Sequence, residues 1–77
     1  MKSYIKALLV ELSEGPLTWH HAVRLGWSSA ERDIGKAGVR RRAIIRAMEV
    51  GWIADCGGKL VITQEGRRDL RDAYGVR

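Results

Sequence analysis

The sequence predicts a mainly α-helical fold with one small β-hairpin. Four segments place apolar residues at the three- and four-residue spacing of a helix face. Two short apolar runs flank a Gly-Gly pair, which is typical of a hairpin. The chain has 77 residues, of which 45% are hydrophobic and 30% charged, so we expect one folded domain over 1–77 that is neither disordered nor embedded in a membrane.

The first predicted helix begins near Ser3 and ends at Gly15. Its core-facing residues share one apolar face and are Ile5, Leu8, Leu9 and Leu12. Gly15 is expected to take the left-handed conformation that ends a helix. Pro16 cannot continue the helix, so 16–17 should form an extended link.

A shorter second helix is predicted after Thr18, whose hydroxyl is a good N-cap. Trp19, Ala22 and Val23 form its apolar stripe, and Gly26 is expected to end it. In the next segment, Ser28 or Ser29 is a candidate cap for a further turn over 30–34. Gly35 and Gly38 are expected to interrupt helical structure there.

A third helix is predicted from Val39 to Val50. At 3.6 residues per turn, one half of its circumference is apolar, with Val39, Ala43, Ile44, Ala47, Met48 and Val50. The other half carries Arg41, Arg42, Arg46 and Glu49. Ile45 lies among these charges, and Arg40 points toward the apolar side, where it is expected to project past the edge of the core.

The hairpin and a last helix complete the predicted elements. Residues 52–55 and 60–62 are the two β-prone runs of a two-stranded hairpin, with a turn over 56–59. Because an isolated hairpin is marginally stable in water, we expect it to pack on the helices. Thr63 can cap a final helix through Tyr74, with Leu70, Ala73 and Tyr74 facing inward and Gly75 closing it.

This order of elements resembles that of a winged helix-turn-helix domain of bacterial and phage regulators. Residues 41–53 are similar to the recognition helix running into the wing, and 62–68 to the "Leu-Thr-x-x-Gly-Arg" run after it. Residues 15–18 and 25–28 resemble the two ends of the second helix. The chain departs from the pattern in having ten residues, 29–38, where the family has a tight turn. Either an extra turn is inserted there or the recognition helix begins earlier, near Lys36.

The resemblance implies duplex-DNA binding by a transcriptional regulator or accessory DNA binder. Arg41, Arg42 and Arg46 would divide between bases and phosphates. The positioning contacts would come from Lys36, Arg40, Lys59 and the helix caps Ser28 and Ser29. The resemblance is also compatible with a homodimer formed through the first and last helices.

The charge distribution favours a polyanionic partner. The net charge is +5, and five basic residues without an acid lie between Lys36 and Arg46. The alternative for such a run is a solvated helix face. An acidic protein partner is a second alternative, with Ile45 and Trp27 as candidate interface residues. RNA is less favoured, because the aromatic residues are scattered and form no stacking platform.

Several other function classes are not expected. The sequence has no Gly-rich phosphate loop, no nucleophile beside a base and no useful carboxylate pair, so we predict neither an enzyme nor a cofactor or small-molecule site. Adjacent His20 and His21 point about 100° apart on a helix and cannot form a metal pair. The single Cys56 cannot form an intramolecular disulfide, and with no signal peptide or membrane span we expect a cytoplasmic protein.

Overall fold

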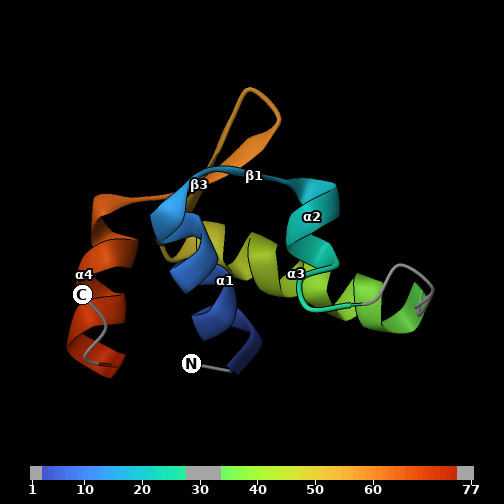
Figure 1. Ribbon diagram of the computed structural model, residues 1–77, viewed down its shortest axis with the longest axis horizontal. Helices are drawn as coiled ribbons and strands as arrows, with labels where there is room; N and C mark the ends of the chain where they lie inside the picture. Colours follow the sequence, from blue (N-terminus) through green and yellow to red (C-terminus); the bar gives the residue numbers. More distant parts are fainter. Residues whose placement is uncertain (1–2, 28–33, 75–77) are drawn as a thin grey trace.

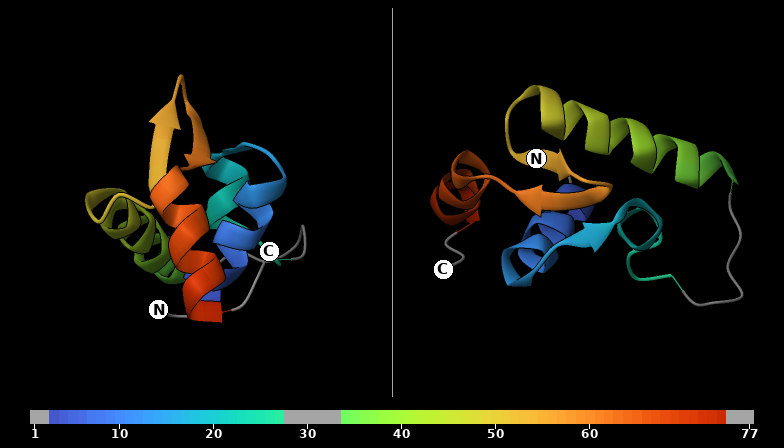
Figure 2. Two further views of the ribbon diagram at one scale, coloured as in Figure 1. Left: turned by 90° about the vertical axis from the view of Figure 1, so that its left-hand side faces the viewer. Right: turned by 90° about the horizontal axis from the view of Figure 1, so that it is seen from above.

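A computed structural model describes residues 3–27 and 34–74, and within them the chain forms four helices and a three-stranded antiparallel sheet. In chain order the elements are α1 (Ser3–Glu14), β1 (Leu17–Thr18), α2 (Trp19–Val23), α3 (Ile34–Glu49), β2 (Ile53–Cys56), β3 (Lys59–Ile62) and α4 (Gln64–Tyr74). The hairpin of β2 and β3 projects beyond the helices, and α3 runs along one side of the molecule (Figures 1 and 2). The mainly α-helical class with a C-terminal helix is therefore confirmed.

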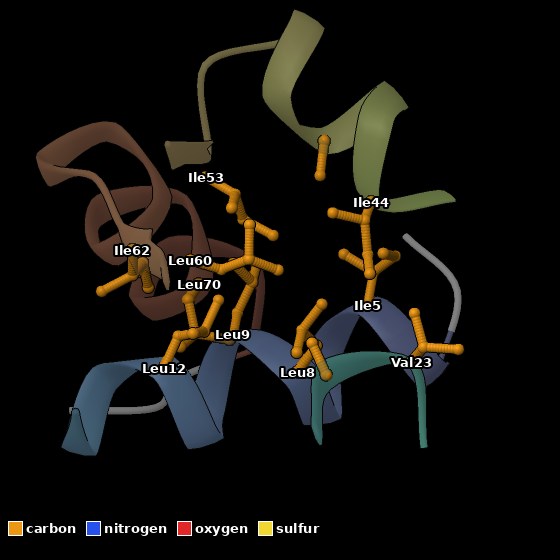
Figure 3. Close-up of a cluster of buried hydrophobic side chains, with 12 residues drawn as sticks. Ile5, Leu8, Leu9, Leu12, Val23, Ile44, Ile53, Leu60, Ile62 and Leu70 are labelled. Atoms are coloured by element: carbon orange, nitrogen blue, oxygen red, sulfur yellow. The ribbon is translucent and has the colours of Figure 1, made fainter. Parts of the chain in front are cut away.

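The core forms around the apolar face of α1. Each of its predicted core residues is buried, namely Ile5, Leu8, Leu9 and Leu12. Ile5 points toward Ile44 of α3, while Leu60 of β3 and Leu70 of α4 lie farther along α1, near Leu9 and Leu12 (Figure 3). Because α1 packs against α3, α4 and the sheet together, it is the scaffold on which the rest of the molecule is placed.

The sheet has one strand more than the sequence predicted. The expected extended link after Pro16 pairs with β3, with Leu17 opposite Leu60 and Thr18 opposite Lys59. The strand order is β1-β3-β2. Proline forces the chain out of the helix, and an extended segment beside a hairpin edge satisfies backbone groups that would otherwise face water. The prediction of a two-stranded sheet was therefore incomplete, and β1 joins the hairpin to the helices.

The hairpin turn is made by Gly57 and Gly58. Both have positive φ, 63° and 88°, as a two-residue turn of type I′ requires. Asp55 accepts a hydrogen bond from the backbone nitrogen of Gly58 at 3.0 Å. The sequence predicted this hairpin because glycine adopts positive φ at low cost and Gly-Gly is one of the pairs typical of such turns.

Helix α3 begins five residues earlier than predicted and includes both expected breakers. It starts at Ile34, so Gly35 and Gly38 are helical. A glycine costs a helix only about 1 kcal/mol relative to alanine, and packing on the core offsets such a cost. The start near Lys36 was thus the better alternative. Of the turn proposed over 30–34, residues 30–33 and the candidate caps Ser28 and Ser29 lie outside the described residues, and Ile34 is the first residue of α3.

Other helix ends follow the prediction with small differences. Thr18 caps α2 by accepting from the backbone nitrogen of His21 at 3.2 Å. Helix α2 ends at Val23, and Gly26 follows with φ 79°. Helix α1 ends before Gly15 as expected, but Gly15 does not have positive φ. A bond from its nitrogen to the carbonyl oxygen of Leu12, 3.2 Å long, closes the last turn instead.

The Thr63–Gly66 run after the hairpin has a structural explanation. The Thr63 side chain accepts from the backbone nitrogen of Gly66 at 3.0 Å, which confirms it as the cap of α4. The same hydroxyl donates to the carbonyl oxygen of Gly51. A Cβ on Gly66 would lie 2.3 Å from the carbonyl oxygen of Trp52, so no other residue fits without backbone movement. The pattern therefore fixes the start of α4 against the end of α3.

Candidate nucleic-acid interface

Three arginines of α3 are exposed, as the sequence predicted. Arg41, Arg42 and Arg46 lie on the part of the helix that faces away from the core. Arg42 and Arg46 are one turn apart and share a face, and Arg41 is rotated by about 100° from Arg42. Within the part of the chain that the structure describes, none of the three has a hydrogen bond or an ion pair. Their guanidinium groups are therefore available to an external acceptor.

Arg40 lies at the inner edge of α3 and has an internal role. One nitrogen of its half-buried guanidinium donates to the carbonyl oxygens of Val23 at 3.0 Å and Leu25 at 2.8 Å. Val23 is the last residue of α2 and Leu25 lies two residues beyond it, where carbonyls lack intrahelical partners. Arg40, predicted to be a positioning contact for DNA, thus joins α3 to the segment after α2.

Two aromatic rings enclose the Arg40 guanidinium. Its central carbon lies 4.3 Å from the ring centroid of Tyr4 and 4.8 Å from that of Trp27. Lys36 is exposed at the N-terminal end of α3, with its ammonium nitrogen 5.3 Å from the Trp27 ring centroid. Trp27 itself is half-buried, and its indole nitrogen has no hydrogen-bond partner among the described residues. Trp27 therefore packs beside Lys36 and Arg40 near the start of α3. It is half-buried, whereas the sequence left open that it is exposed.

The β2–β3 hairpin supplies one cation. Lys59 is the first residue of β3, exposed beside the Gly57-Gly58 turn and opposite Cys56. The indole nitrogen of Trp19 donates to Asp55 at 3.3 Å and so links α2 to the hairpin. Together with the β1–β3 pairing, this contact fixes the direction in which the hairpin projects.

The apolar residues of α3 divide into buried and exposed groups. Ile44 and Ala47 are buried, and Ala43 and Met48 are half-buried, as predicted. Val39 and Val50, predicted to face the core, are 53% and 48% exposed. The apolar residues of α3 occupy a wider arc of its circumference than α1 covers, so Val39 and Val50 stay exposed. Ile45 is 46% exposed on the opposite flank, which agrees with its predicted place among the charges.

Tyr4 supports the site through its contact with Arg40, although no sequence motif pointed to it. Its hydroxyl donates to the carbonyl oxygen of Ala22 at 2.7 Å, and its ring lies against Arg40. Burial raises the pKa of Tyr4 from 10.0 to about 12, with the positive charge of Arg40 opposing part of that rise. The signal available was its spacing of four from Leu8, which places the ring on the buried side of α1.

Trp52 was predicted only as part of a strand, and it also has a positioning contact. Its indole nitrogen donates to Asp69 of α4 at 2.6 Å, which holds the turn after α3 against α4.

Among residues 3–27 and 34–74 there is no group of three metal-ligating side chains, and Cys56 is an exposed thiol. None of the helices described is both long and apolar enough to cross a bilayer.

Comparison of the chain with protein-family models, curated proteins and solved structures gives no match. Function is therefore inferred from the geometry of α3 and the β2–β3 hairpin.

Proposed function

We propose that this chain is a small duplex-DNA-binding protein of the winged-helix type, with α3 as its recognition helix and the β2–β3 hairpin as its wing. The observation that carries the proposal is the row of exposed arginines on α3 that have no hydrogen-bond or ion-pair partner among the described residues. The order of the elements supports it. Helices α1 to α3 followed by the β2–β3 hairpin is the order of the winged-helix domains that the sequence resembles.

The dimensions of α3 suit a major groove. Its 16 residues give a length of about 24 Å, and the groove is about 12 Å wide, which admits one helix. Arg42 and Arg46 share a face on which a guanidinium can donate two bonds to O6 and N7 of guanine. Arg41, on the adjoining face, is placed to meet a phosphate oxygen. Base reading and backbone positioning would thus be divided among three neighbouring side chains.

Other parts of the domain would position the helix. Lys59 at the wing turn and Lys36 near the start of α3 are exposed cations that suit phosphate contacts. Arg40 links α3 to the carbonyl oxygens at the end of α2, so the helix that carries the exposed arginines is held in place. Such a domain would serve as a transcriptional regulator or accessory DNA binder in the cytoplasm, with a homodimer matching two half-sites.

The experiment is a fluorescence-anisotropy titration with a labelled random-sequence duplex at two salt concentrations. We expect a Kd on the order of 10⁻⁴ to 10⁻⁶ M that rises steeply with salt, because arginine contacts release counterions from the phosphates. Arg42→Ala should weaken binding while leaving the unfolding transition in place. Absence of binding at low salt by the folded wild-type protein would refute the proposal.

A second candidate function is recognition of an acidic protein surface through the same face. The observation that favours it is the exposed Ile45 between the arginines, since a large aliphatic side chain gains nothing from phosphates. Ile45→Glu and Arg42→Ala separate the two candidates. Loss of function in Ile45→Glu with retention in Arg42→Ala would favour the protein partner.

A further inference from the structure

A groove runs along the flank of α3 that faces away from Ile45. It has a volume of about 740 Å³ and lies between α3, the N-terminal part of α1 and the turn after α3. Val39, Ala43, Ala47 and Val50 line it from α3, and Ile5 and Trp52 line it from the facing elements. The two unexpectedly exposed valines, 39 and 50, belong to this groove. Their exposure is therefore part of one continuous apolar surface.

The groove has basic residues and no acidic residue along its lining. Lys36, Arg42 and Arg46 line it along α3, and Arg40 lines it from the side of the helix that faces α1. No Asp or Glu is among the lining residues in the part of the chain described. An occupant that matches this surface presents apolar side chains to the groove and carboxylates to its edges.

The length of the groove selects an extended partner. Lys36 and Val50 mark its two ends on α3 and are 14 residues apart, which is about 21 Å at 1.5 Å per residue. That is the length of a helix of about four turns. Apolar residues spaced by three and four on such a helix form one stripe, as in other helix-in-groove complexes. A small ligand would leave most of this length uncovered.

Electrostatics argue against a second copy of the chain as the occupant. A symmetric dimer through this surface would place the basic residues of one groove opposite those of the other. Each chain already carries a net charge of +5, so repulsion would oppose the contact. An acidic occupant removes that repulsion and covers the valines.

We propose that this groove binds an acidic amphipathic helix of another protein. This site shares Arg42 and Arg46 with the proposed DNA-binding face, but it lies on a different flank of α3 from Arg41 and Ile45 and requires no bound DNA. Val39 and Val50 are its apolar contacts, and Arg42 and Arg46 meet the carboxylates. The partner is recognised by its stripe of aliphatic side chains bordered by Glu or Asp.

The probe is a labelled 14-residue helical peptide with leucines at helix-face spacing and glutamates elsewhere. The comparison peptides are a scrambled glutamate–leucine peptide and one with lysine in place of each glutamate. Each is titrated in the absence of DNA against the wild-type chain, Val39→Glu, Val50→Glu and Ile45→Glu. All three substitutions are at exposed positions and add the same charge, so Ile45→Glu is the matched control on the other flank. Circular dichroism verifies that each variant is folded.

The proposal predicts that the acidic amphipathic peptide binds the wild-type chain more tightly than both comparison peptides. Val39→Glu and Val50→Glu should each weaken it by about tenfold or more, equivalent to about 1.4 kcal/mol, while Ile45→Glu changes it by less than about threefold. No binding of the acidic peptide to the wild-type chain, equal binding of the lysine peptide, or equal loss in Ile45→Glu would each overturn it. So would self-association of the wild-type chain that Val39→Glu abolishes, since a second copy would then be the occupant. The peptide titration contains no nucleic acid. Failure of the duplex titration would therefore refute the DNA-binding proposal and leave the groove proposal standing.

Discussion

Arg40 and Arg42 are two residues apart in α3 and have opposite environments. The Arg40 guanidinium is half-buried, bonded to two backbone carbonyls and enclosed by the rings of Tyr4 and Trp27. Arg42 is exposed and has no partner among the described residues. The rotation of about 200° between them on the helix accounts for the contrast.

The basic run of α3 contains two kinds of cation, one that holds the fold together and one that faces solvent. Between Lys36 and Arg46 the sequence shows five similar charges, and all of them were candidate DNA contacts. In the structure Arg40 makes internal hydrogen bonds that hold the fold together, whereas Arg41, Arg42 and Arg46 face solvent. Net charge alone therefore overstates the cations available to a partner, and the position of each on the helix separates the two kinds.

The largest expected effect is on stability, from Arg40→Ala. Hydrogen bonds from a charged group contribute about 1.5–3 kcal/mol each, and contacts with aromatic rings contribute about 0.5–2 kcal/mol more. Because contributions are not additive, we expect the free energy of unfolding to fall by about 3 kcal/mol. Urea unfolding monitored by circular dichroism measures it.

Arg42→Ala is the matched control for this change. Removing an exposed side chain without partners should alter the free energy of unfolding by no more than about 0.5 kcal/mol. Similar unfolding midpoints for the two variants would show that the carbonyls of Val23 and Leu25 find other partners. The assignment of Arg40 to the fold would then fail.

The next effect concerns affinity for a specific duplex, once a preferred sequence has been selected from a random library. If Arg42 reads a base, Arg42→Ala should weaken specific binding by about 1–3 kcal/mol and relax specificity at one position. Lys59→Ala should weaken all sequences equally and lower the slope of log affinity against log salt by about 1. Unchanged affinity in both variants would remove α3 and the wing from the interface.

The fold was predictable to the extent that local patterns decide it. The spacing of Ile5, Leu8, Leu9 and Leu12 predicted the buried face of α1, and Gly57-Gly58 predicted the hairpin turn. The start of α3 was missed because packing outweighs the cost of Gly35 and Gly38 in a helix. Strand β1 was missed because pairing of Leu17 with Leu60 is a contact between distant parts of the chain.

The candidate site was predictable only in part, for the same reason. Helical phase correctly placed Arg41, Arg42 and Arg46 on the exposed side. Whether Val39 and Val50 are covered depends on the width of the neighbouring helix, which periodicity within α3 does not contain. The groove therefore appears only when α1 and Trp52 are placed beside α3.

The smallest expected effect lies on the Arg40 side of α3, at Tyr4. Tyr4→Phe keeps the ring against Arg40 but removes the hydroxyl that donates to the carbonyl oxygen of Ala22. A single hydrogen bond of this kind contributes about 1 kcal/mol to the free energy of unfolding. Urea unfolding near neutral pH should resolve this loss. A variant as stable as the wild type would show that the carbonyl oxygen is equally well satisfied by its backbone donors.

The same variant tests the environment of Tyr4 through pH. Folding raises the pKa of Tyr4 from 10.0 to about 12, so the folded protein holds the phenol proton more tightly than the unfolded chain does. The resulting stabilisation is complete below pH 10 and is lost as the pH rises through the folded pKa, because the unfolded chain ionises first. The stability difference between wild type and Tyr4→Phe should therefore shrink between pH 10 and about 12. Tyrosinate absorbance isolates the group, since the chain has two tyrosines and the variant retains Tyr74 alone. A difference titration of the folded proteins centred at the ordinary pKa would mean that Tyr4 is solvated, and that Arg40 lacks the enclosed setting that distinguishes it from Arg42.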